Sequence, residues 1–504
     1  MNVPRLIRTL GHLRAAQILH QITWRLGRPR PSMRSAPEHE IPACRTSFIL
    51  KDACLADGVF IFLNISAPFP GWTDTSRGLL WAYNLNYMDW LVQKGLSAGE
   101  GAAWIDGFAE GFQQNGIGQD PYPTALRLHN WIKFFILHPE QRTRSREDSL
   151  YSQYKFLQKR IERHLDGNHL LEDAFALYAS AAWFGEKEET ERFGKMLEGL
   201  LGEQILPDGA HFEQSPMYHC ILLERLLDCC NLRPTEELER QAGRMLGHLE
   251  SIVREDGGIP LLNDSALGIA PAPSLLRAYA RRLGLEAGPL PLRECGYRRL
   301  SAGPLEATID VGGITAPWQP GHSHADCFNY ELNIAGRPAV CDSGISTYEK
   351  NARRQWERST EAHNTVTVNG MDSSEVWSGF RVGARASVKL LEDNAEGAFA
   401  VHDGFGKCLH FRLFRISASG FYVKDSLSVE ADAVSRIHLA PEAGPAKVSG
   451  GRVICRDFSI RVQGASSVKV VPGLCAREFN RLLENETIEI RFRKDASYTI
   501  EPKQ

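Results

Sequence analysis

The chain has 504 residues, of which 43% are hydrophobic and 24% are charged, and its formal net charge is −3. This composition is typical of a soluble globular protein, and the length predicts two to four folding units, of which two large ones fit best. The negative net charge, without any zinc-finger, basic-zipper or phosphate-loop pattern, excludes nucleic acid as an expected partner.

The first 36 residues form a basic segment with seven arginines and no acidic residue. The segment lacks the uninterrupted apolar stretch and the small-residue cleavage site of a secretory signal. Leu6, Leu10, Leu13 and Leu19 recur at roughly helical spacing. We therefore expect a basic helix that docks on the body of the protein, with peripheral contact to an anionic membrane surface as the alternative.

The cysteines bear on the cellular compartment. All eleven are scattered along the chain without CxxC pairs, which indicates reduced thiols. No apolar stretch is long enough to span a bilayer. Together with the missing secretory signal, these features predict a cytoplasmic protein, with association at the inner membrane left open.

Helical periodicity dominates the chain from about residue 78 to residue 285. Apolar residues return every three or four positions in segments such as LLWAYNLNYMDWLVQKG and MYHCILLERLLDCC. Short breaks such as Pro207-Asp208-Gly209 separate these segments. Many helices of similar length predict an array or ring of antiparallel helix pairs.

The periodicity changes to two after about residue 290, as in HNTVTVNG and in the alternating Phe458, Ile460 and Val462. This pattern is typical of half-buried antiparallel strands, and so many strands indicate a large sandwich. We therefore predict an α+β multidomain protein, all-helical first and all-strand second, with the domain boundary near residues 280 to 300.

Polar residues that suit an anionic ligand occur in the segment GNHLLED. Asn168, His169 and Glu172 follow Gly167 and are expected at or near a helix N-terminus, where free backbone N–H groups favour negative charge. The simpler interpretation is that Asn168 is the helix N-cap and that His169 is an ordinary structural histidine.

A second candidate segment is ILPDGAHFEQSPMYH, in which Glu213, Tyr218 and His219 lead from a Pro-Asp-Gly turn into an apolar helix. A tyrosine at the start of such a helix is usually a core residue with its hydroxyl at the edge. Taken alone, Tyr218 therefore carries little functional information.

The strand-rich half contains the strongest local signal, in GHSHADCFNYELNIAGRPAVCDSG and the following HNTVTV. His322, His324, Asp342 and His363 supply three imidazoles and a carboxylate, the nitrogen and oxygen ligands that zinc accepts. Their loose spacing is what ligands on neighbouring strands would have. The alternative is a set of unrelated polar strand residues.

Taken together and in this order, GNHLLED, DGAHFEQSPMYH, GHSHAD and the Asp-Ser-Gly then His-Asn-Thr-Val run resemble the heparinase II/III family of polysaccharide lyases. The resemblance covers roughly residues 60 to 430. It implies an N-terminal incomplete (α/α) toroid followed by a C-terminal antiparallel β-sandwich. The expected units are a basic N-terminal segment (1–60), the toroid (61–287) and the sandwich (288–504).

The resemblance also implies roles for individual residues. Tyr218 matches the catalytic acid or base, and His322 matches the histidine that faces it across the cleft. Asn168 and His169 match the positions that bind and neutralise the substrate carboxylate. Further substrate-binding positions are expected at Glu172, Arg127, Glu213 and Tyr348. Zn²⁺ with a structural role is expected on His324, Asp342 and His363.

The function implied is β-elimination of a uronic-acid-containing polysaccharide, with removal of the C5 proton and loss of the group at C4. The basic N-terminal segment resembles that of family members linked to bacterial surface-polysaccharide assembly, so a surface polysaccharide or exopolysaccharide is the expected acidic substrate. A non-lytic carbohydrate-binding or assembly protein and a zinc-dependent glycan hydrolase are the alternatives. An exposed sandwich face can also support a homodimer.

Overall fold

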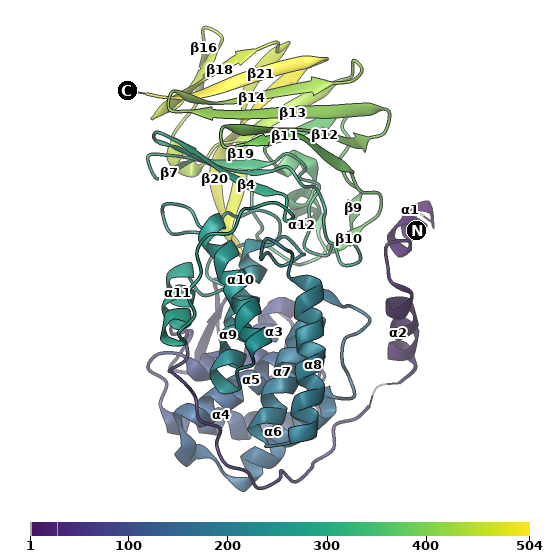
Figure 1. Cartoon of the computed structure of the whole chain (residues 1–504), viewed down its shortest axis with the longest axis vertical. Coiled ribbons are helices and arrows are strands. Elements are labelled where there is room, and N and C mark those ends of the chain that lie inside the picture. Colours follow the sequence, from purple (N-terminus) through teal and green to yellow (C-terminus); the bar gives the residue numbers. More distant parts are fainter. Residues whose placement is uncertain (1–2, 28, 504) are drawn as a thin grey trace.

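The computed structural model describes residues 3–27 and 29–503 and has two layers, a helical body and a strand-rich body stacked on it (Figure 1). The predicted fold class, a helical toroid followed by an antiparallel β-sandwich, is confirmed. The last helix of the toroid ends at Arg282, and the first strand of the sandwich begins at Tyr297.

The toroid is built from long helices whose apolar faces dictate their place. In α5, α7 and α9 nearly every residue is buried, and α7 packs against both α5 and α9. Only one face of α8 is buried, so this helix covers the inner ones from outside. The helices are α3 (Leu79–Tyr87), α4 (Ala98–Gly111), α5 (Pro121–Leu137), α6 (Arg144–Leu157), α7 (Gly167–Trp183), α8 (Lys187–Gln204), α9 (Pro216–Leu232), α10 (Glu236–Ile252) and α11 (Pro273–Arg282), with 3-10 turns η1 (Asp89–Val92) and η2 (Pro139–Gln141).

A small three-stranded sheet precedes the toroid and packs on it. Phe60 and Phe62 from this sheet are buried in the same apolar core as the toroid helices. Phe60 contacts Trp90 edge to face, with ring centroids 5.1 Å apart. The strands are β1 (Leu55–Ala56), β2 (Val59–Phe62) and β3 (Ile65–Pro68).

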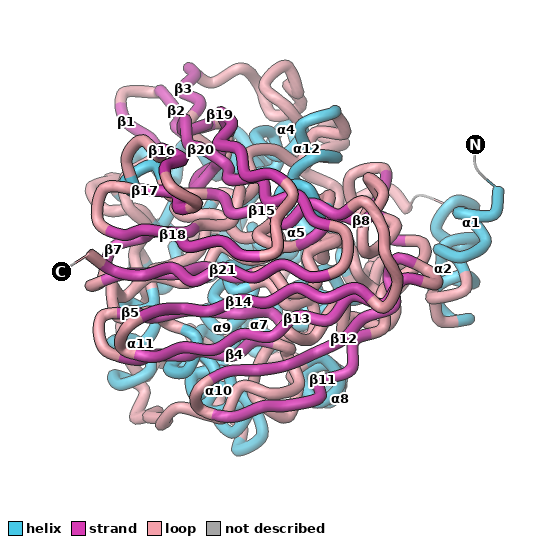
Figure 2. The backbone as a smooth tube through the Cα atoms, turned by 90° about the horizontal axis from the view of Figure 1, so that it is seen from above, coloured by secondary structure: helices cyan, strands magenta, loops and turns pink. Residues whose placement is uncertain are grey.

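The sandwich has an eight-stranded sheet in the order β11-β12-β13-β14-β21-β18-β17-β16 and two four-stranded sheets, β4-β5-β6-β7 and β19-β20-β15-β8. Figure 2 shows the large sheet lying across the top of the molecule. The strands are β4 (Tyr297–Ala302), β5 (Leu305–Asp310), β6 (Tyr330–Ile334), β7 (Arg337–Val340), β8 (Val366–Val368), β9 (Val376–Trp377), β10 (Arg381–Val382), β11 (Val388–Asn394), β12 (Gly397–Phe405), β13 (Cys408–Ser417), β14 (Gly420–Leu427), β15 (Ala433–His438), β16 (Lys447–Ser449), β17 (Arg452–Ile454), β18 (Phe458–Gln463), β19 (Ser467–Glu478), β20 (Arg481–Phe492) and β21 (Asp495–Pro502).

Buried and more exposed side chains alternate along the strands as expected, and the buried ones form the core of the sandwich. Every second residue of β13 is buried, and Phe414 from this strand joins Phe421 of β14 and Tyr330 of β6 in the core. The ring of Tyr330 lies 5.2 Å from that of Phe421 between centroids. A short helix, α12 (Ala352–Glu357), and the 3-10 turns η3 (Thr360–Ala362) and η4 (Pro441–Ala443) interrupt the strands.

The basic N-terminal segment forms two helices, α1 (Val3–Leu10) and α2 (Ala15–Leu26), along one side of the molecule (Figure 1). We call residues 3–26 the N-terminal strap. Its first helix contacts the sandwich, since Arg8 pairs with Glu375 at 2.8 Å. Its second helix contacts the toroid, since the side-chain amide of Gln17 donates to the carbonyl of Leu165 at 3.2 Å. The strap therefore bridges both bodies.

In the described part of the chain, no helix combines the length and the apolar character needed to cross a bilayer.

Candidate active site

A cavity of about 980 Å³ lies where the toroid, the sandwich and the N-terminal strap meet. Tyr218, Asn168 and His169 line it from the toroid, and His322 and Tyr348 line it from the sandwich side. The structure thus gathers five of the predicted site residues around one cleft. The strap covers part of this cleft with Leu6, Thr9, Leu10, His12, Leu13, Gln17, Gln21 and Arg25.

Tyr218 projects from the first turn of α9. Ser215 caps this helix by accepting a hydrogen bond from the Tyr218 backbone N–H at 3.2 Å, and Pro216 occupies the first helical position, where no N–H is needed. Burial raises the pKa of Tyr218 well above its ordinary value. The hydroxyl therefore stays protonated in the free protein. Tyr348 donates a hydrogen bond to it at 3.4 Å.

His322 stacks on Tyr218, with 4.0 Å between ring centroids. Its Nδ1 lies 2.9 Å from a carboxylate oxygen of Asp264, which can only accept, so Nδ1 carries the proton of the neutral ring. The side-chain amide of Asn168 lies 3.2 Å from Nε2 and donates to it. In this tautomer the lone pair of His322 lies on Nε2, where Asn168 is its hydrogen-bond donor.

The start of α7 holds Asn168 in place. The helix N-cap is Asp166, and Asn168 sits in the first turn instead. Glu213 accepts hydrogen bonds from both the backbone N–H and the side-chain amide of Asn168, each at 2.8 Å. Gly167 has a φ of +59°, and an added Cβ would lie only 2.1 Å from a Glu213 oxygen. Only glycine fits at this position.

His169 and Glu172 are three residues apart in α7, but only His169 lines the cleft. His169 lines the cleft and its Nδ1 lies 2.9 Å from Glu162. Burial lowers the pKa of His169, but Glu162 outweighs it, so the net shift is upward and favours a cationic ring. Glu172 is fully buried behind the cleft, and burial raises its pKa to about 7. The substrate contact expected at Glu172 is not found in the cleft lining.

Arg127 also differs from its expected place. It is fully buried inside the toroid, where its guanidinium donates to Gln153 at 2.6 Å and to the carbonyl of Gly118 at 2.7 Å. Its side chain is used to hold the chain together and does not line the cavity. This placement argues against the substrate-binding role that the resemblance implies for Arg127.

Asp264 is a site residue that the motifs missed. It is fully buried and accepts hydrogen bonds from His322, from His324 at 2.8 Å and from both terminal nitrogens of Arg354. Arg354 comes from α12 of the sandwich, so the pair joins the two bodies directly behind His322. Its only signal in the sequence is the polar Asn-Asp-Ser that follows the apolar run IPLL.

The three expected zinc ligands lie near one another in the sandwich. His363 Nδ1 is 2.7 Å from an oxygen of Asp342, and the rings of His324 and His363 are 5.2 Å apart between centroids. His324 uses its Nε2 to contact Asp264. The remaining nitrogens, Nδ1 of His324 and Nε2 of His363, are buried and have no hydrogen-bond partner among residues 3–27 and 29–503. Orphaned ring nitrogens of this kind are what a bound metal would satisfy.

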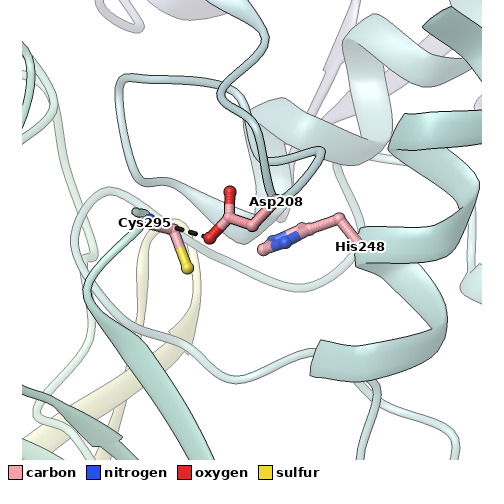
Figure 3. A group of neighbouring side chains, drawn as sticks. All are labelled: Asp208, His248 and Cys295. Carbon is pink, nitrogen blue, oxygen red and sulfur yellow. Dashed lines mark hydrogen bonds between the residues drawn. The ribbon is translucent and has the colours of Figure 1, made fainter. Parts of the chain in front are cut away.

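A second group of buried side chains places potential metal ligands close together. One ligand atom from each of Asp208, His248 and Cys295 lies within 4.8 Å of the others, and all three residues are buried (Figure 3). Asp208 also accepts a hydrogen bond from the backbone N–H of Cys295 at 2.9 Å. Asp208 lies in the loop before Tyr218, His248 lies in α10, and Cys295 lies two residues before β4. The protein thus contains a group that could hold a metal ion.

The architecture and the cleft define a toroid–sandwich protein, and comparison with known families narrows this class. The model of the heparinase II/III N-terminus matches residues 147–245, and the model of the heparinase II/III-like C-terminal domain matches residues 286–501. The chain therefore belongs to the heparinase II/III-like family.

Similar proteins of known name support this family assignment. A heparin-sulfate lyase from Pedobacter heparinus is 24% identical over 241 residues, which cover 41% of this chain and 36% of that protein. The chain thus matches about a third of the length of this relative. A solved heparinase III structure has a TM-score of 0.61 at 17% identity and covers 86% of this chain and 80% of its own. A heparan sulfate lyase structure from Pedobacter heparinus has a TM-score of 0.58 at 15% identity, with 86% and 78% covered.

Proposed function

We propose that the protein is a polysaccharide lyase that cleaves a uronic-acid-containing glycan by β-elimination. The observation that carries the proposal is the stacked pair of Tyr218 and His322 in a cleft that Asn168 also lines. A proton donor and a proton acceptor on the same sugar are what abstraction at C5 and departure at C4 require.

The geometry favours different catalytic roles for Tyr218 and His322. Asp264 accepts from Nδ1 of His322, so in the neutral ring the lone pair lies on Nε2, the nitrogen beside Asn168. The hydroxyl of Tyr218 keeps its proton, because burial raises its pKa. We therefore assign His322 as the base that takes the C5 proton and Tyr218 as the acid that protonates the departing C4 oxygen. The carboxylate of Asp264 stabilises the imidazolium that forms.

Negative charge moves into the substrate carboxylate as the C5 proton leaves, so donors aimed at that group lower the barrier. One amide N–H of Asn168 donates to Glu213, which can only accept and so sets the orientation of the amide. The other N–H meets Nε2 of His322 in the free protein and would be released to the substrate carboxylate when Nε2 takes the C5 proton. His169 adds a ring whose pKa is raised by Glu162 after the opposing effect of burial. Both line the cleft beside His322. We assign them to the uronate carboxylate.

Within this proposal, the substrate is an acidic surface polysaccharide or exopolysaccharide, met by a cytoplasmic or inner-membrane-associated enzyme. The support is the charge of the cleft: Arg25, Lys350, Arg381 and Arg385 line it, against the single acid Glu349. Such a lining attracts anionic chains.

We further propose a structural Zn²⁺ on His324, Asp342 and His363. His324 and His363 do not line the cleft, so a metal there would brace the sandwich behind His322. This position speaks against the zinc-hydrolase alternative, in which the metal would have to reach the substrate.

Elemental analysis of the purified protein tests the metal and its location. We expect about one zinc per chain, lost in His324→Ala and retained in His248→Ala. Retention in His324→Ala with loss in His248→Ala would move the metal to Asp208, His248 and Cys295. Metal-free wild-type protein of unchanged stability would remove the metal from the proposal.

A panel of uronate-containing bacterial glycans tests the activity. We expect at least one glycan to give products that absorb in the ultraviolet, because elimination leaves a double bond conjugated with the carboxylate. Saturated ends would indicate a hydrolase. Measurable affinity without cleavage across the panel would indicate the non-lytic carbohydrate-binding protein.

A further inference from the structure

Arg385 stands out among the residues of the cleft wall. It lies shortly after β10 and lines the cavity that also holds Tyr218 and His322. One terminal nitrogen, Nη1, donates to the carbonyls of Ala316 and Pro317 at 2.7 and 3.0 Å. These contacts fix the guanidinium against the loop that runs on to His322.

The opposite edge of this guanidinium has no partner in the described part of the chain. Its Nε and Nη2 are both buried, and neither makes a hydrogen bond to a described residue. Among the residues that the structure describes, no carboxylate pairs with Arg385, and burial alone lowers its pKa to about 10. The side chain is therefore a cation at neutral pH with an unsatisfied, desolvated edge.

Three other buried arginines have partners within the chain. Arg354 meets Asp264 with both terminal nitrogens, and Arg412 meets Asp425 through Nε and Nη2. Arg127 has no carboxylate, but it donates to Gln153 and to backbone carbonyls. A buried charge without a partner is costly, and proteins normally pair it. The unpaired edge of Arg385 therefore points to a partner that comes from outside the chain.

Arg385 also lines a second cavity with Asp372, Glu375 and Asp403, none of which pairs with it, whereas its surroundings on the cleft side fit an anion. His12 of the strap lies close enough for Arg385 to lower its pKa, in addition to the larger effect of burial. The cavity lining carries four lysine or arginine residues against one glutamate. The Nε and Nη2 of one guanidinium form a flat pair of donors that matches two oxygens of a carboxylate or a sulfate.

We propose that Arg385 is an anion-binding residue that takes a carboxylate or sulfate group of a sugar flanking the cleaved linkage. This inference rests on the proposed function for its substrate, but the anion site itself stands on the contacts of Arg385. In the proposed function, Asn168 and His169 hold the uronate that reacts, so Arg385 would bind a second acidic group. The enzyme would then select chains in which acidic sugars recur.

Calorimetric titration with sodium sulfate and with sodium glucuronate, each against sodium chloride of equal ionic strength, tests the site without turnover. We expect saturable binding of at least one of the two anions to the wild type. In Arg385→Gln this binding should weaken at least about tenfold, since two charge-assisted hydrogen bonds are lost. Arg385→Lys keeps the charge but not the paired donors and should also weaken it.

Arg163→Gln is the control, because Arg163 is an exposed arginine that lies outside the cavity lining. It should leave anion affinity within about twofold of the wild type. Equal losses in both variants, or no saturable binding of either anion to the wild type, would overturn the site. If the wild type binds the anion through Arg385 but shows no elimination activity on any glycan, the anion site stands and only the proposed lyase activity is contradicted.

Discussion

Tyr218→Phe is expected to lower the rate of unsaturated-product formation by about 10²–10⁴-fold, the range that a positioned general acid contributes. The change removes one hydroxyl from a partly buried ring that stays stacked on His322. Without that hydroxyl, the C4 oxygen must leave without a proton. The rate of absorbance increase on the glycan that the wild type cleaves measures the effect.

Tyr83→Phe provides the control for this prediction. Tyr83 lines the same cavity, but its hydroxyl donates to Asp120 at 2.8 Å and takes no part in the stacked pair. We expect this variant to keep activity within a few fold of the wild type. If Tyr218→Phe is folded and as active as Tyr83→Phe, the acid is another group and the assignment is wrong.

The spacing of apolar residues along the sequence predicted most of the fold. The change from a repeat of three or four to a repeat of two separates α11 from β4, because a toroid helix and a sandwich strand bury their side chains at different intervals. Short motifs also marked both ends of the cleft, since Asn168 and Tyr218 each open a helix and His322 lies on the loop that faces them.

The site residues that the sequence did not reveal are those brought together by contacts between distant segments of the chain. Asp264 meets His322 and Arg354, which are 58 and 90 residues away in the sequence, and no local pattern reports such contacts. Arg127 shows the opposite error. The family resemblance implied a substrate contact, yet the donors of Arg127 are taken up by Gln153 and backbone carbonyls in the core.

The strap is a further case in which packing decides between sequence interpretations. Its arginines are compatible with an anionic membrane or with the protein itself. The structure places Arg8 against Glu375, and the guanidinium of Arg14 lies 3.3 Å from the ring centroid of Trp318. Leu6, Leu10 and Leu13 face the cleft, while Ile7, Ile18 and Leu19 are exposed. Docking on the body thus leaves an apolar outer face, so contact with a membrane stays a prediction.

Asp264→Asn is expected to have the second large effect, on stability and activity together. Arg354 donates to both carboxylate oxygens of Asp264. Whichever way an asparagine amide is turned, its NH₂ group meets an arginine donor. The buried guanidinium loses its counter-charge, which costs about 3–5 kcal/mol in the free energy of unfolding. Chemical denaturation of the variant measures this loss.

The activity of Asp264→Asn should fall by about 10²–10⁴-fold even in the protein that remains folded, because the Nδ1 proton of His322 loses its acceptor and the imidazolium its stabilising charge. Asp425→Asn separates this effect from general destabilisation. Asp425 forms the same kind of buried cluster, with Arg412 and with His410 at 2.9 Å, inside the sandwich and outside the cleft lining. It should lose comparable stability yet keep near wild-type turnover per folded molecule. Equal turnover in the two variants would show that Asp264 only holds the two bodies together, and that the orientation of His322 is set elsewhere.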